Sequence, residues 1–182
     1  APASVALTGA AFPIGGSINS FSIGSPLNTD VTIGAAGTYT SLTGAGGLFA
    51  AINAGGISAN ITARILDASV TETGANVLNA ITYGCAAGPY TLTIKPDAGV
   101  TTAITGSSAT SLIKLNGADY VTIDGSNNGS SSRTMTITNT GTGSVVWIGT
   151  DATAGATNNT LKNFNMVGPG SFSGPGIRSE AR

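Results

Sequence analysis

The sequence predicts an all-β chain that folds as a parallel β-helix with a short helical cap on its N-terminal side. Apolar residues recur along the chain at nearly constant steps of 29, 33 and 33 residues. The equivalent pairs are Ile94 and Ile123, Ile104 and Ile137, and Leu115 and Ile148. Each repeat holds three short strand-like runs, and the additional residues of the longer steps fall in one loop, DGSNNGSSS. A period of about 30 residues with these properties is typical of a solenoid.

The N-terminal part of the chain precedes the clear repeats and divides into two segments. Residues 1–37 form a β-rich segment, in which the alternations SINSFSIG and VTIGA predict short strands. Residues 38–56 form the capping segment, where two glycines at 55–56 give a helix stop. The apolar residues with roughly helical spacing are Leu42, Leu48, Phe49 and Ile52. A helix suits this place because the open end of a β-stack must be covered.

Residues 57–168 are expected to form the coils of the solenoid. In NITARILDA, period-two alternation places Ile61, Ala63 and Ile65 on one face. Ile65 lies 29 residues before Ile94, which assigns it to the preceding coil. Near the other end, NNTLKNFNMVG offers inward-pointing apolar side chains. These are Leu161, Phe164 and Met166.

The ends of the coils carry turn chemistry. Asn116, Asn127 and Asn139 are expected to close strands or enter turns, because Asn tolerates the left-handed conformation, and stacked Asn side chains can form amide ladders. Residues 169–182 include SGPGIRSEAR and are expected to be a tail of turns or the start of further coils. The last coil should therefore leave an open β-edge, which recruits more coils of a longer parent protein or another chain.

Composition excludes several classes of function. Only 8% of the 182 residues are charged, the net charge is −1, and there is no basic run, which argues against binding to nucleic acid or to an anionic membrane surface. No stretch approaches the roughly 18 apolar residues of a membrane-spanning helix, so no membrane insertion is expected. Histidine is absent, which removes the commonest general base and metal ligand. The single cysteine, Cys85, cannot form a disulfide within the chain.

The stretch YVTIDGSNNGSSSRTMTITNT, with TLTIKPDAGVTTAITGSSATSLIKLNGAD before it and GATNNTLKN after it, resembles a known repeat type. It is similar to the right-handed parallel β-helix, pectin-lyase-like repeats of large secreted Bacteroidetes surface proteins. The resemblance covers about residues 38–168. It implies a right-handed solenoid, export through type IX secretion, and a role as an adhesin or surface fibre. The steps of 29–33 residues predict about four to five coils.

An enzyme of the pectin-active kind would need clustered acids on one outer face, within about 5–10 Å of each other for work on a glycosidic bond. Asp119 and Asp124 flank the run YVTI, and alternation points Asp124 outward. The position equivalent to Asp124 on the preceding coil is Lys95, and Asp97 lies on the loop beside it. A lyase would also need a basic residue near its acids, and Arg133 is the only nearby candidate. We therefore expect no catalytic residues, no cofactor and no metal.

Two other features bear on the outer faces. A flat array of outward Thr side chains can order water, as in ice-binding solenoids, but Thr91 and Thr93 fall on a different strand of the coil from Thr134 and Thr136. Trp147, the only tryptophan, aligns directly over Lys114, and both are outward. A tryptophan beside a cation suits sugar stacking or a protein interface. We include Tyr120 as a third candidate residue.

These observations predict a non-catalytic, extracellular or cell-surface module with a structural or adhesive role. Its expected partners are a glycan or a protein surface, together with self-assembly through the ends of the solenoid. A carbohydrate-active lyase-like or hydrolase-like β-helix is the alternative, and an ice-binding solenoid is the third hypothesis.

Overall fold

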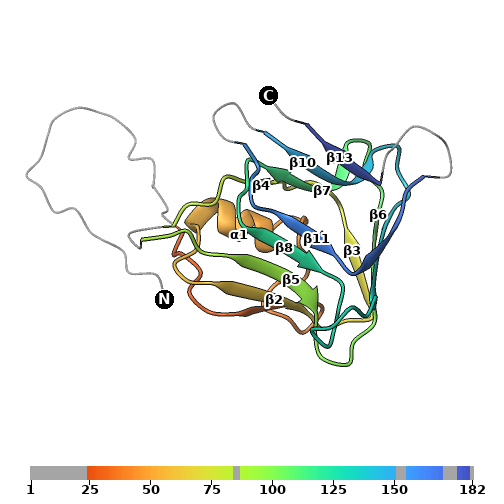
Figure 1. Cartoon of the computed structure of the whole chain (residues 1–182), viewed down its shortest axis with the longest axis horizontal. Coiled ribbons are helices and arrows are strands. Elements are labelled where there is room, and N and C mark those ends of the chain that lie inside the picture. Colours follow the sequence, from red (N-terminus) through yellow and green to blue (C-terminus); the bar gives the residue numbers. More distant parts are fainter. Residues whose placement is uncertain (1–23, 84–86, 151–154, 170–175, 181–182) are drawn as a thin grey trace, which may run out of the picture.

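The computed structural model describes residues 24–83, 87–150, 155–169 and 176–180. It is a parallel β-solenoid in which three sheets run along the stack (Figure 1). The first sheet has the order β1-β2-β5-β8-β11, the second β12-β9-β6-β3, and the third β13-β10-β7-β4. The strands are β1 (Val31–Ile33), β2 (Ile61–Ile65), β3 (Ser69–Glu72), β4 (Leu78–Asn79), β5 (Leu92–Pro96), β6 (Thr102–Gly106), β7 (Ser111–Asn116), β8 (Val121–Asp124), β9 (Met135–Asn139), β10 (Ser144–Gly149), β11 (Thr160–Lys162), β12 (Phe164–Val167) and β13 (Ile177–Ser179).

Four coils follow β1, and each contributes one strand to every sheet. All ladders between these strands are parallel, and the registers that the apolar repeat predicts are confirmed. Ile94 pairs with Ile123, Ile104 with Ile137, and Leu115 with Ile148. The inserted loop lies between β8 and β9. The predicted fold class is thus the observed one.

One register differs from the simple repeat. Ile65 belongs to the coil before Ile94, as expected, but its partner is Pro96, and Ile94 pairs with Ala63. The step from β2 to β5 is therefore 31 residues, two more than the step from β5 to β8. A shift of two residues preserves the inward and outward alternation. Ile61, Ala63 and Ile65 accordingly all remain buried.

The helix is shorter than the apolar spacing predicts. Helix α1 spans Leu48–Gly55, and Leu42, although fully buried, lies in the loop before it. The backbone N–H groups of Leu48 and Phe49 donate to the carbonyls of Ser41 and Leu42, so the loop, rather than a side chain, caps the first turn. The glycine stop is confirmed, because Gly56 follows the helix with φ of 74°. Helix α1 packs against β4, the strand at the N-terminal end of the third sheet, where the segment that starts with β1 adds no further strand to that sheet.

The core is a column of aliphatic side chains that fills the inside of the coils. The inward residues of β5, β6 and β7 are fully or almost fully buried, as are their equivalents on β8 and β9. Such side chains contribute about 1.5–3 kcal/mol each when buried. Because a residue stacks on its equivalents above and below, one coil depends on its neighbours for stability.

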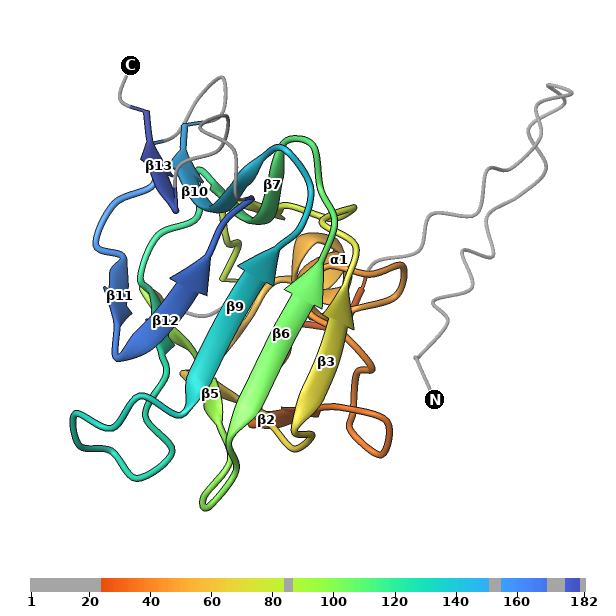
Figure 2. The same ribbon diagram turned by 90° about the vertical axis from the view of Figure 1, so that its right-hand side faces the viewer.

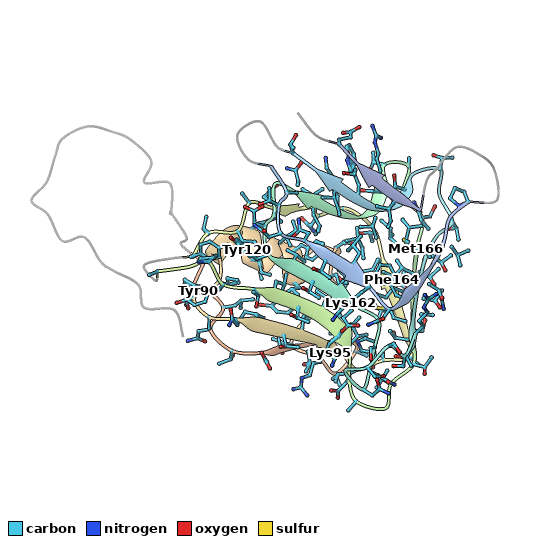
Figure 3. The ribbon with its side chains drawn as sticks, viewed as in Figure 1. Tyr90, Lys95, Tyr120, Lys162, Phe164 and Met166 are labelled. Atoms are coloured by element: carbon cyan, nitrogen blue, oxygen red, sulfur yellow. The ribbon has the colours of Figure 1, made fainter. Side chains whose placement is uncertain are left out.

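The last coil is less covered than the others. Leu161, Phe164 and Met166 take the predicted inward register but are only half-buried. Figure 3 labels Phe164 and Met166 on this coil. Of the two alternatives for residues 169–182, a tail of turns or more coil, Ile177–Ser179 follows the second, because it forms β13 and pairs with β10. Two large apolar side chains, Val167 and Ile177, are exposed here at 47% and 45%.

Two features of the sequence analysis fall on residues that the structure does not describe. The alternation over residues 17–23 and Cys85 lie outside the described residues. Across the described ranges, no helix combines the length and the apolar character needed to cross a bilayer.

Candidate functional site

Trp147 lies at the centre of an outward column on the third sheet. It pairs with Lys114 of β7, as the sequence predicts, and with Arg178 of β13 on the other side. The Lys114 Nζ atom lies 3.8 Å from the centroid of the indole, and the Arg178 Cζ atom lies 4.4 Å from it. The ring is therefore held between two cations from neighbouring coils, and each contact is a cation–π interaction.

The two cations limit how a ligand can contact Trp147. Both faces of the ring are covered, so a sugar cannot stack on them while Lys114 and Arg178 stay in place. The indole Nε1 atom is buried and has no hydrogen-bond partner among the described groups. It lies over Gly149, where a Cβ atom would be only 2.9 Å away. The groups left accessible are cationic: Lys114 is half-buried, and Arg178 is exposed and ion-paired with Glu180.

A hollow of about 260 Å³ lies beside this column. Besides Trp147 and Arg178, its lining comes from small and hydroxyl-bearing residues of the turn between β9 and β10, of the first position of β10, and of the turn before β7. They are Ala109, Thr110, Thr142, Gly143 and Ser144. The column and the hollow together form a cationic, hydroxyl-lined surface.

Tyr120 lies at a different place, on the turn from the third sheet into the first. It adopts a positive φ of 58° and lies near Tyr83, whose ring meets that of Tyr90 edge to face at 6.0 Å. Figure 3 shows Tyr90 and Tyr120 at the end of the first sheet nearest α1. Burial raises the pKa of Tyr83, and the negative charge of Asp119 adds to this effect. The structure therefore places Tyr120 in a tyrosine cluster and not beside Trp147.

The first sheet carries a charged outward column at the other end of its strands (Figure 3). Arg64 pairs with Lys95, and Asp124 pairs with Lys162. The predicted equivalence of Lys95 and Asp124 follows from the pairing of the residues just before them. The outward Thr residues of the same strands form a second column. They are Thr62, Thr93, Thr122 and Thr160.

Asp124 is less open than its outward position suggests, because its side chain is only 12% exposed. Asn163 and the backbone N–H of Ser126 donate to its carboxylate at 2.9 and 3.0 Å, and the Lys162 Nζ atom is 3.3 Å away. Burial by itself raises the pKa of Asp124, but these hydrogen bonds and the lysine outweigh it and hold the pKa below its ordinary value. A carboxylate held in this way is a poor proton donor near neutral pH.

Most of the described carboxylates connect one coil to the next. Four of them accept hydrogen bonds from backbone N–H groups: Asp30 from Thr62, Asp67 from Ala35, Glu72 from Leu42 and Thr43, and Asp119 from Thr157. Two form ion pairs, Asp97 with Arg64 and Asp124 with Lys162. The partners lie 29–39 residues apart in sequence. The only other described carboxylate, Glu180, pairs with Arg178 on the same strand end. These acids therefore connect neighbouring coils by hydrogen bonds and ion pairs.

The outward side of the second sheet is uncharged. Its positions form two columns across four strands, and we call this set the hydroxyl face. The columns are Ser69–Ala103–Thr136–Asn165 and Thr71–Thr105–Thr138–Val167. The sequence separates Thr93 and Thr136 onto different strands, and this is confirmed, since β5 and β9 belong to different sheets.

Sequence reasoning missed three features of these surfaces. The turn-like composition of SGPGIRSEAR gives no strand signal at Arg178, although its 31-residue distance from Trp147 continues the repeat. Thr71 and Thr105 come from different coils, and only the pairing of β3 with β6 shows that they belong to one column. The role of Glu72 leaves no local signal, since its partners Leu42 and Thr43 come from another coil.

Within the described ranges, no group of three His, Cys, Asp or Glu side chains comes close enough together to hold a metal ion. The chain matches no protein-family model, and comparisons with curated proteins and with solved structures also give no match.

Proposed function

We propose that this chain is a non-catalytic structural module of an extracellular or cell-surface bacterial protein, and that it presents its outer faces to a partner. The observation that carries the proposal is the use of the carboxylates. Six of them connect neighbouring coils, and four of these accept hydrogen bonds from backbone N–H groups of another coil. An acid committed to such contacts stabilises the stack and is not free to exchange protons with a substrate.

The extracellular setting rests on the resemblance of residues 38–168 to the repeats of secreted Bacteroidetes surface proteins. The low charge and the hydroxyl-rich turns of the sequence agree with that class. Type IX secretion is part of the same proposal. Labelling of intact cells of the source organism with an impermeant reagent tests the extracellular location, since an intracellular protein would react only after lysis.

The adhesive role is assigned to the column of Lys114, Trp147 and Arg178. Two cations on one indole, with hydroxyl groups beside them, suit the carboxylates of an acidic glycan better than a neutral sugar. Trp147 is the only tryptophan and reports binding by its fluorescence. Titration with polygalacturonate should change this fluorescence, whereas neutral dextran should not.

Matched lysine variants separate this site from general charge attraction. Lys114→Met removes a cation that contacts the indole, and Lys95→Met removes one from the first sheet. We expect Lys114→Met to weaken binding about fivefold, which corresponds to roughly 1 kcal/mol, and Lys95→Met to leave it nearly unchanged. Equal losses in the two variants would mean that the polymer binds by net charge alone, and the site assignment would then be wrong.

The carbohydrate-active alternative makes the opposite prediction. A lyase acting on a uronate polymer creates an unsaturated product that absorbs in the ultraviolet, and a hydrolase releases reducing ends. We expect neither product. Turnover that is lost in Asp124→Asn would overturn the structural proposal.

A further inference from the structure

The hydroxyl face is a regular surface. Along the stack its residues repeat at the strand spacing of about 4.8 Å, and along each strand they repeat at about 6.7 Å, which is two residues of extended chain. Figure 2 shows β3, β6, β9 and β12 side by side, with no other described element drawn across them. Six of the eight side chains are exposed and two, Thr136 and Thr138, are half-buried.

The side chains beneath this face hold its positions fixed. The inward residues that alternate with the face on β3, β6 and β9 are buried, with Ile104 and Ile137 fully so and Val70 at 3% exposure. The backbone is locked by parallel ladders on both sides of β6 and β9. Threonine is branched at Cβ and has few accessible rotamers, so its hydroxyl and methyl groups are held in nearly constant positions.

The hydroxyl groups of the face are free to bind water. Among the described contacts, no protein group bonds the side-chain oxygen of Ser69, Thr71, Thr105, Thr136 or Thr138. Threonines where a strand begins behave differently: the Thr102 hydroxyl donates to the backbone carbonyl of Asp67, and the Thr134 hydroxyl donates to that of Gly125. The face is thus an array of hydroxyl groups that only solvent or a ligand can satisfy.

Charge is kept off this face and placed on the other two sheets. The first sheet has a comparable column of threonines, but its neighbouring column holds Arg64, Lys95, Asp124 and Lys162. The third sheet carries Lys114 and Arg178. No outward position of β3, β6, β9 or β12 is charged or aromatic. Charged groups hold water in their own hydration shells, and their absence leaves the hydroxyl face free to order water in the pattern of its own lattice.

We propose that the hydroxyl face of the second sheet binds ice. An ice surface repeats its oxygen atoms at regular intervals, so a rigid array of hydroxyl and methyl groups can match many of them at once. A flat crystalline polysaccharide is the other repetitive ligand, but its recognition relies on aromatic rings that stack on sugars. The tyrosines and the tryptophan lie elsewhere on the molecule. This binding goes beyond the structural role proposed above and does not depend on it.

Inhibition of ice recrystallisation by the full chain tests the proposal, with two matched variants. Thr138→Lys places a long charged side chain in the middle of the hydroxyl face. Thr122→Lys makes the same change at a half-buried position of the same coil on the first sheet. We expect the concentration needed for inhibition to rise at least about tenfold for Thr138→Lys, as for loss of a central contact residue. It should stay within a factor of two of the unmodified protein for Thr122→Lys.

Circular dichroism establishes that each variant is folded. If Thr138→Lys does not fold, Thr105→Lys makes the same test at an exposed position of the adjacent coil. The proposal is overturned if the unmodified chain inhibits recrystallisation no better than an unrelated β-protein at equal mass. It is also overturned if both lysine variants lose activity equally, or if Thr138→Lys abolishes binding to crystalline cellulose while leaving the effect on ice unchanged.

Discussion

Replacement of Glu72 tests whether buried carboxylates hold the N-terminal coil onto the stack. Glu72 is 2% exposed, and its two oxygens accept from the backbone N–H groups of Leu42 and Thr43, each at 2.6 Å. The Thr43 hydroxyl also donates to Glu72 and accepts from the N–H of Gly74. One side chain therefore satisfies the loop that precedes α1 and connects it to β3.

The magnitude follows from the groups that would lose their partner. Glu72→Ala leaves two buried N–H groups and a buried hydroxyl without an acceptor. A hydrogen bond to a charged group contributes about 1.5–3 kcal/mol, so we expect a loss of about 3–5 kcal/mol in the free energy of unfolding. Glu72→Gln keeps one oxygen, which can serve Thr43, and turns an NH₂ group toward Leu42. Its expected loss is about 1–3 kcal/mol.

Urea unfolding followed by circular dichroism measures the effect, and Asp97→Ala is the control. Asp97 also connects two coils, but its pair with Arg64 is open to solvent, with side-chain exposures of 29% and 45%. Exposed pairs contribute at most about 1 kcal/mol. Amide hydrogen exchange at Leu42 and Thr43 shows whether the cap opens by itself before the stack unfolds. The reasoning fails if Glu72→Ala costs no more stability than Asp97→Ala.

Three further predictions concern other contacts. Because the pKa of Asp124 is lowered in the folded state, its contribution is present above the ordinary carboxyl pKa of about 3.9 and disappears as the pH falls through the folded-state value. The stability difference between the unmodified chain and Asp124→Asn, measured by urea unfolding, should therefore be about 1–2 kcal/mol at pH 7 and shrink below pH 4; a constant difference would contradict this. Asn139→Ala should lower stability by about 2–4 kcal/mol in the same assay, because the fully buried amide donates to three backbone carbonyls and accepts two N–H groups; a loss below that of an exposed Asn→Ala change would refute it. Lys114→Met should change the fluorescence of Trp147 without ligand while lowering stability by less than about 1 kcal/mol, and an unchanged spectrum would mean that the cation is not on the ring in solution.

Much of the fold could be predicted because local sequence patterns, namely alternation within strands and the recurrence of apolar residues, specify the solenoid. Alternation identifies the inward residues of β5, β6, β8 and β9, and the recurrence of these residues fixes which strands are neighbours. Part of the candidate site follows from the same repeat: the placement of Trp147 over Lys114 needed only the register of Ile148 on Leu115. Turn chemistry located the end of α1, since glycine adopts the left-handed conformation without strain.

The rest could not be predicted because it depends on contacts between coils. The start of α1 is set by backbone carbonyls of Ser41 and Leu42, which no helical pattern reveals. Strand β13 is short and is preceded by glycine and proline, so its local sequence favours turns, and pairing with β10 overrides that preference. As a result, the second cation on Trp147 could not be recognised.

The sequence by itself determined that the chain is a β-solenoid, which residues face its interior and where its insertion lies, because alternation and period are properties of neighbouring residues along the chain. Only the tertiary structure decided that Trp147 is enclosed by Lys114 and Arg178, that the acids tie coils together, and that the second sheet has an uncharged hydroxyl face. Each of these depends on the register of strands about 30 residues apart, where a change of two residues leaves the alternation intact but gives every outward side chain different neighbours.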